Sequence, residues 1–325
     1  MFSALCICLL FAVMFLSIAL ATVAMLPAFR VAYRFADRTG SSGMANILFG
    51  LRAFPVLLGG LASLGLALPA FLKFEPHTTH EIPGEALLLF AGAGIVLAAV
   101  MSVRYTLTMR ATRQVREQWL KNATLLPGPK AHIPVYCVEG AASLLAVTGI
   151  FSPRIFVSRD VVESLTPAEL DAALSHEVAH VSATDNLKQL FMQVTRPPNW
   201  LRSFAKVDFA WARFAELAAD ERAMRSGASA LELSSALVKV GRLSAGQRPN
   251  LLTASHLVDS CSAATMARVA RLRDLLEREN QAQTPGASRH HSALLPWMGS
   301  LLLMYLLLLG TVLPQIHEVL EFLVR

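Results

Sequence analysis

Two histidines and one glutamate occupy residues 176–180 in the order HEVAH, a spacing typical of a zinc site that carries its own general base. On a helix, residues four apart share a face and lie about 6 Å apart along the axis, so His176 and His180 can both face one metal ion. Glu177 lies beside that face, where its carboxylate could accept a proton from an attacking water. With 9 His in the chain, chance would produce about 0.01 such matches. Two ordinary structural histidines on a helix are the alternative interpretation.

The residues before the motif predict the helix that it needs. Thr166 and Glu169, with Pro167 between them, have the form of a capping box that starts a helix. Apolar residues then recur at helical spacing, with polar residues between them. Such a helix is amphipathic and too polar to cross a bilayer, so we expect the zinc site in a soluble region.

The residues after the motif exclude one class of zinc peptidase. A metzincin would carry glycine and histidine at the positions where this chain has Ala183 and Asn186. The third ligand must therefore come from another part of the sequence.

A second amphipathic helix, predicted over residues 208–225, carries Glu216 and Asp220 four residues apart on one face. Acidic residues on a helix usually form a solvated face, but this segment is rich in alanine and follows the HEVAH motif. We predict that Glu216 completes a two-histidine, one-glutamate zinc site with His176 and His180. Asp220 would then orient a ligand imidazole.

Several segments resemble the membrane gluzincins of the BlaR/MecR antibiotic-sensor type. They are residues 152–158 (SPRIFVS), residues 170–180 with the HEVAH motif, and residues 185–187 (DNL). Residues 216–220 (ELAAD) are also similar to the E-x-x-A-D motif of the related HtpX/CaaX-type proteases. The resemblance implies a zinc metalloendopeptidase with one Zn²⁺ and an α+β zincin-like catalytic domain. In gluzincins a sheet edge lies beside the cleft, where an extended substrate can pair as an added strand.

The composition predicts an α-helical integral membrane protein. Hydrophobic residues make up 54% of the chain and charged residues 16%, below the globular average of about 25%. Four uncharged stretches are long enough to form transmembrane helices. They are Met1–Phe29, Ala53–Leu72, Ala86–Val103 and Ala293–Ile316.

The arginines predict the orientation of these spans. Arginines gather between the first and second stretches and again after the third, whereas the intervening loop carries only Lys73 among basic residues. By the positive-inside rule, the N-terminus lies outside and the central region lies in the cytoplasm of a multi-pass plasma-membrane protein. The net charge of +6 fits contact with anionic lipid. A direct nucleic-acid partner is the rival interpretation of this charge, and the clustering of the arginines at span ends argues against it.

These features divide the chain into three predicted parts. Residues 1–103 hold three transmembrane helices, residues 104–290 form the catalytic domain inserted between the third and fourth helices, and residues 291–325 hold the fourth helix and a short tail. Within the domain, an Arg-rich helical segment is expected at 104–121. Short strands are expected over 133–138, 144–147 and 155–157, and helices over 230–243 and 261–279.

Other polar residues are weaker candidates. The 4 cysteines show no C-x-x-C pairing, which agrees with a reducing compartment. His256 and Arg268 lie where gluzincins often carry a group that stabilises an oxyanion, and residues 268–272 are similar to an R-I-x-x-L segment of the family. We nevertheless expect a solvated helix face there and leave both out of the predicted site.

We weighed regulatory proteolysis at the cytoplasmic membrane face, with a transcriptional repressor as a possible substrate, against two other functions. The alternatives are an HtpX-like quality-control protease and a membrane receptor or scaffold with a degenerate site. Because nine residues past the last span are too few for a ligand-binding domain, we expect no response to a β-lactam by this chain alone.

Overall fold

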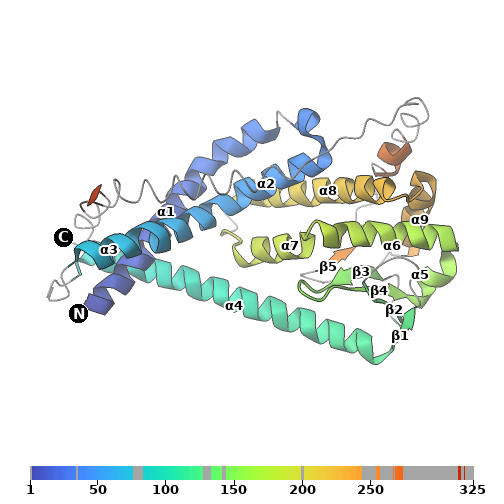
Figure 1. Cartoon of the computed structure of the whole chain (residues 1–325), viewed down its shortest axis with the longest axis horizontal. Helices are drawn as coiled ribbons and strands as arrows, with labels where there is room; N and C mark the ends of the chain where they lie inside the picture. Colours follow the sequence, from blue (N-terminus) through green and yellow to red (C-terminus); the bar gives the residue numbers. More distant parts are fainter. Residues whose placement is uncertain are drawn as a thin grey trace. The chain divides into compact units, whose positions relative to one another are not determined.

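The computed structural model describes residues 2–33, 36–75, 83–126, 133–140, 144–198, 201–243, 254–256, 266, 268–273, 314–315 and 318. These residues are mostly helical and include one small mixed sheet (Figure 1). The chain divides into two compact units. The first comprises residues 1–31, 50–102 and 285–325, and the second comprises residues 32–49 and 103–284.

Long apolar helices dominate the N-terminal third of the chain. They are α1 (Phe2–Tyr33), α2 (Ala36–Gly60), the π-helical segment η1 (Leu61–Ala67), α3 (Leu68–Phe74) and α4 (Glu85–Lys121). In lipid, a helix satisfies every backbone hydrogen bond within itself, so uncharged stretches of this length fold as helices. Among the described residues, three segments are long and apolar enough to cross a membrane: Phe2–Ala32, Gly40–Phe74 and Glu85–Lys121.

These segments contain the first three predicted spans. The predicted fourth span, 293–316, lies outside the described residues except for Pro314 and Gln315. The Arg-rich segment 104–121 continues the third span as one helix, α4, as predicted. Within the first unit, glycine allows close packing: a Cβ on Gly94 would collide with the backbone oxygen of Phe11.

The sheet of the second unit has five strands in the order β1-β2-β4-β3-β5. Their bounds are β1 (Ala123–Leu126), β2 (Val135–Val138), β3 (Leu145–Thr148), β4 (Arg154–Ser158) and β5 (Ala254–His256). β2 and β4 pair in parallel, and the other neighbours pair antiparallel. The three predicted strands are confirmed as β2, β3 and β4, whereas the sequence analysis missed the edge strands β1 and β5. Edge strands of three or four residues carry too little alternating pattern to be recognised.

Helices cover one face of this sheet in the second unit. They are α5 (Arg159–Ser164), α6 (Pro167–Ser182), α7 (Asp185–Val194), α8 (Arg202–Arg225) and α9 (Ala230–Leu243). α6 packs against β3 and β5 as well as against α8 and α9, so it lies between the sheet and these helices (Figure 1). The core between them is aliphatic and includes Val147, Ile155, Ala173, Leu233 and Leu237. The helix carrying the HEVAH motif is therefore held on several sides.

The segment that follows α1 also belongs to the second unit. Gly40, with φ 66°, bends α2 near its start, and Ser41 beyond it is buried. The Ser41 hydroxyl donates to Glu221 on α8 at 2.8 Å, and Arg271 forms an ion pair with the same carboxylate at 2.6 Å. Residues 41–49, expected only as part of a basic connection, are thus part of the second unit.

Glu169 ties the start of α6 to α9. The predicted capping box forms: the Thr166 hydroxyl accepts from the Glu169 amide, and the Glu169 carboxylate accepts from the Thr166 amide. The same carboxylate accepts from Lys239 at 2.6 Å and from Ser235 at 2.5 Å. The hydrogen bonds from Lys239 and Ser235 lower the pKa of this carboxyl group to about 2.

We predict that Glu169 makes the stability of this unit depend on pH. Because its pKa is lowered from 4.5 to about 2 on folding, its contribution is present above pH 4.5 and is lost as pH falls from 4.5 towards 2. A Glu169→Gln variant should be less stable near neutral pH and should lose less stability on acidification. Thermal unfolding in detergent from about pH 6 to about pH 3 measures this difference. Glu163→Gln, an exposed change on α5, is the control, and equal acid sensitivity in both variants would contradict the prediction.

Candidate metal centre

The two histidines of the HEVAH motif point together from α6. The side chains of His176 and His180 are almost fully buried, and their Nε2 atoms lie 3.1 Å apart. The i, i+4 spacing on a regular helix brings the rings to one face, where their centroids are 4.8 Å apart. The capped start of α6 and its packing against the sheet hold this face in place.

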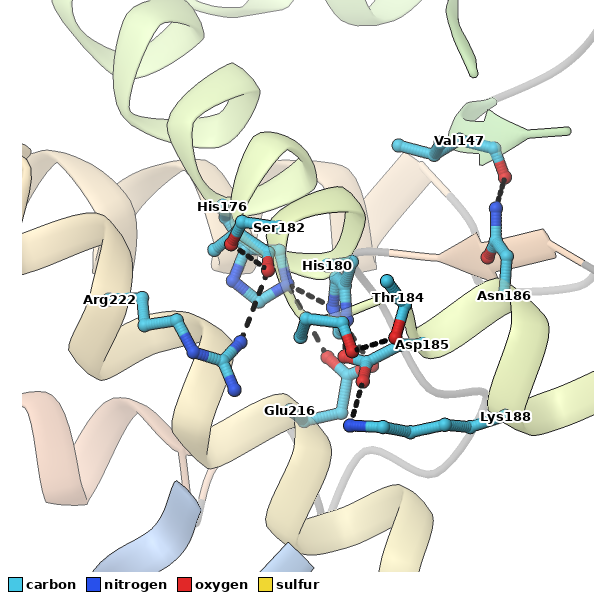
Figure 2. A network of polar contacts seen from close by, with 12 residues as sticks. Val147, His176, His180, Ser182, Thr184, Asp185, Asn186, Lys188, Glu216 and Arg222 are labelled. Carbon is cyan, nitrogen blue, oxygen red and sulfur yellow. Dashed lines mark hydrogen bonds and ion pairs between the residues drawn. The ribbon is translucent and has the colours of Figure 1, made fainter. Parts of the chain in front are cut away.

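Glu216 on α8 completes a three-residue cluster with these histidines (Figure 2). Its two carboxylate oxygens lie 3.5 Å from His176 Nε2 and 3.5 Å from His180 Nε2. Two ligand atoms bound to zinc at about 2.05 Å with tetrahedral angles lie about 3.3 Å apart. The spacing and the donor set therefore fit one zinc ion, with a fourth position left for water or substrate. The residues predicted as ligands are brought together by the structure.

A carboxylate lies on the Nδ1 side of each imidazole, opposite the metal-binding Nε2 atom, and orients the ring. His176 Nδ1 lies 2.8 Å from Asp220 on α8, and His180 Nδ1 lies 2.8 Å from Asp185 at the start of α7. An ionised carboxylate can only accept a hydrogen bond, so His180 Nδ1 carries the proton and its Nε2 offers a lone pair to a metal. The charge of Asp220 beside His176 Nδ1 favours the same tautomer of that ring. Asp220 was predicted for this role. Asp185 was not, although it belongs to the DNL segment used for the resemblance.

The turn between α6 and α7 places Asp185. Thr184 adopts a left-handed conformation with φ 56°, which is unusual for a residue with a branched side chain. Asn186 then donates from Nδ2 to the carbonyl oxygen of Val147 at 3.3 Å (Figure 2). It also donates to the carbonyl oxygen of Gly149 at 3.1 Å. These bonds anchor the start of α7 to the end of β3, and so hold the Asp185 carboxylate behind His180.

Arg268 compensates the charge of the acidic groups. Its guanidinium binds Asp220 through two nitrogens, at 2.6 and 2.9 Å, and a third nitrogen lies 2.9 Å from Glu216. Burial raises the pKa values of Asp220 and Glu216, but the charge of Arg268 and the neighbouring histidines together outweigh burial and lower both below their usual values. The expectation of a solvated face at Arg268 is wrong: its side chain is buried. In the sequence, the signal for Arg268 was the similarity of residues 268–272 to the R-I-x-x-L segment of the family. Such a pattern does not indicate whether a side chain is buried.

Glu177 lies beside the metal-binding face in a dry environment. The residue is fully buried, and neither carboxylate oxygen has a hydrogen-bond partner among the described residues. Burial raises the pKa of this carboxyl group to about 7, although the nearby His176 and His180 oppose the rise. A bound dication would lower the pKa again through its own charge. A carboxylate with a pKa near the working pH is suited to accept a proton and to return it.

His256 lies in β5, whose backbone pairs with β3 at the edge of the sheet next to α6 and α7. Its side chain is outside the described part of the structure. Among the described residues, β5 is therefore the edge strand of the sheet on this side.

The fold and the site define a helical protein with candidate membrane spans, a small mixed sheet and a buried His-His-Glu cluster suited to a metal. The family model described as BlaR1 peptidase M56 matches residues 77–270, so the chain belongs to this peptidase family. Membership supports a metallopeptidase activity acting on a peptide or protein, and with the three apolar helices it supports a membrane protein. No curated protein matched the chain.

We predict that Asp185 strengthens metal binding through His180. An Asp185→Asn change removes the charge that favours the Nδ1–H form, so zinc affinity should fall about 10- to 100-fold. Competition with a chromogenic chelator in detergent measures the affinity. Asp160→Asn, an exposed change on α5, should leave it unaltered. If Asp185→Asn binds zinc as tightly as the parent protein, Asp185 does not support the ligand.

Proposed function

We propose that this protein is a zinc-dependent endopeptidase of the gluzincin type, acting in regulatory proteolysis at the cytoplasmic face of the plasma membrane. The observation that supports this most is the cluster of His176, His180 and Glu216. Its ligand atoms lie within 4.8 Å of one another, and carboxylates back both imidazoles. A buried glutamate beside the cluster adds the group that hydrolysis needs.

Each residue has a role in this proposal. His176 and His180 present Nε2 and Glu216 presents a carboxylate oxygen as the ligand set, while Asp220 and Asp185 hold the imidazoles in the required tautomer. When bound, Zn²⁺ polarises the scissile carbonyl and acidifies water. Glu177 takes the proton from the attacking water and delivers it to the leaving amine. Because Glu177 has no other partner among the described residues, its carboxylate is free to make both contacts.

Arg268 contributes to the same site without acting as a ligand in this scheme. Its bonds to Asp220 and Glu216 favour the ionised form of these carboxylates and hold the Glu216 Oε2 atom, which faces His176. Its Nη2 also lies 3.5 Å from His176 Nε2. We propose that this charge helps to stabilise the oxyanion that develops during hydrolysis.

The alternatives differ in substrate or in activity. A quality-control protease of HtpX type would use the same residues on misfolded membrane proteins. A degenerate receptor or scaffold is disfavoured because the ligands, the base and their carboxylate partners stand at mutually suitable distances. We place the catalytic domain at residues 104–290, flanked by transmembrane helices in 1–103 and 291–325. Its substrate would be an extended segment near the lipid surface, for which a cytosolic repressor is one candidate.

We predict that Glu177→Gln separates metal binding from turnover. Zinc content should remain that of the parent protein because the ligands are intact. Turnover should fall about two to four orders of magnitude because the base is lost. Casein cleavage in detergent and metal analysis measure the two properties. Glu163→Gln controls for the change of charge.

Glu216→Ala gives the complementary result, since it should remove the zinc and the activity together. Full zinc occupancy in Glu216→Ala would move the third ligand elsewhere. Cleavage at the parent rate by Glu177→Gln would show that Glu177 is not the base.

We predict that the catalytic domain faces the cytoplasm. Alkaline phosphatase, which is active only outside the cytoplasm, should be active when fused near Pro76 and silent when fused near Arg38 or Gly246. The reason is that basic loops remain on the cytoplasmic side. Activity at Gly246 would place the domain outside and would exclude a cytosolic repressor as the substrate.

A further inference from the structure

A cavity of about 480 Å³ lies between the C-terminal half of α7, residues 196–198 and 201 of the connection, and the N-terminal half of α8. Met192, Phe204 and Trp211 line it with buried side chains, while Ala205 and Ala212 line it with exposed ones. Small exposed residues leave the cavity accessible, and its volume is in the range of sites that bind a large side chain or a small molecule. No residue of the candidate metal centre lines it.

The spacing along both helices joins this cavity to the metal centre. On α8, Asp208, Ala212 and Glu216 follow each other at intervals of four, so the cavity lining continues directly into the third ligand. On α7, Gln189 and Gln193 follow Asp185 at the same interval. Each interval of four advances about 6 Å, so the cavity begins about one turn from Glu216 and one turn from Asp185.

Both of those residues face the same imidazole. Glu216 Oε1 lies 3.5 Å from His180 Nε2, and Asp185 Oδ2 lies 2.8 Å from His180 Nδ1. The cavity therefore adjoins the metal centre on its His180 side. A peptide with its scissile bond at the metal centre would place a neighbouring side chain at the mouth of this cavity.

We propose that this cavity is a specificity site of the peptidase, which receives a large apolar side chain of the peptide substrate next to the scissile bond. This inference rests on the proposed hydrolytic function and names the class of substrate. The lining favours a peptide over a lipid chain: it combines apolar side chains with the amides of Gln189 and Gln193, and a peptide backbone can use these polar groups whereas an acyl chain cannot.

Filling the cavity tests the proposal through selectivity. An Ala212→Trp change places a large side chain at an exposed lining position, so it need not disturb the core. Full-length protein in detergent is incubated with matched peptide sets that carry either Phe or Ala at each position, and cleavage is followed by mass spectrometry. The ratio of kcat/KM for the preferred Phe peptide to that for its Ala counterpart should fall about 10-fold or more.

Arg213→Trp is the matched control, because Arg213 is exposed on α8 and does not line the cavity. An equal ratio in the parent protein, Ala212→Trp and Arg213→Trp would overturn the proposal. So would a lipid that co-purifies with the parent protein and is lost from Ala212→Trp without any change in peptide selectivity.

A binding measurement separates this proposal from the proposed function. A peptide with benzoylphenylalanine in place of the preferred Phe is photo-crosslinked to zinc-loaded Glu177→Gln, and the attachment site is mapped. Attachment at Met192 or its neighbours in the cavity supports the proposal, whether or not the parent protein hydrolyses peptides. Attachment only elsewhere overturns it. Failure of the parent protein to cleave any peptide would overturn the hydrolytic function alone.

Discussion

The burial of acidic side chains around two imidazoles is the constraint on which the catalytic unit depends. Glu177, Asp185 and Asp220 are buried and Glu216 is largely so, and a carboxylate in a dry environment is costly unless positive charge or hydrogen bonds compensate it. Arg268 provides one full charge, bound to two of these groups. The imidazole N–H groups provide further compensation. A dication at the ligand cluster would supply the rest, so metal binding and the stability of this site are coupled.

The scaffold converts this electrostatic requirement into a defined geometry. α6 brings the two histidines, α8 brings Glu216 and Asp220, and the anchored start of α7 brings Asp185. The aliphatic core beneath α6 fixes the helix against the sheet and α9. Because each imidazole is held at Nδ1 by a different element, a movement of α7 affects His180 and a movement of α8 affects His176.

Residues 41–49 connect to both of these supports within the second unit. Asn46 accepts from Lys188, whose ammonium also lies 3.4 Å from Asp185. Ser41 binds Glu221, the residue after Asp220. Each contact is therefore next to a carboxylate that orients a metal-binding imidazole. Residues 41–49 belong to the second candidate span, Gly40–Phe74, so the start of this span shares a hydrogen-bond network with the site.

The sequence by itself determined the parts of this protein that depend on local spacing. The HEVAH helix follows from its capping box and helical spacing, and the strands β2, β3 and β4 follow from short runs of strand-forming residues. The three apolar helices follow from long uncharged stretches. Each of these patterns can be recognised because it involves residues close together in the sequence. Glu216 and Asp220 were also predicted, since a regular helix places residues four apart on one side. Only the tertiary structure decided the roles of Asp185 and Arg268. In the sequence, Asp185 fits an ordinary helix start, and Arg268 fits a solvated helix face. What distinguishes them is burial and distance to residues up to 92 positions away, which no local pattern encodes.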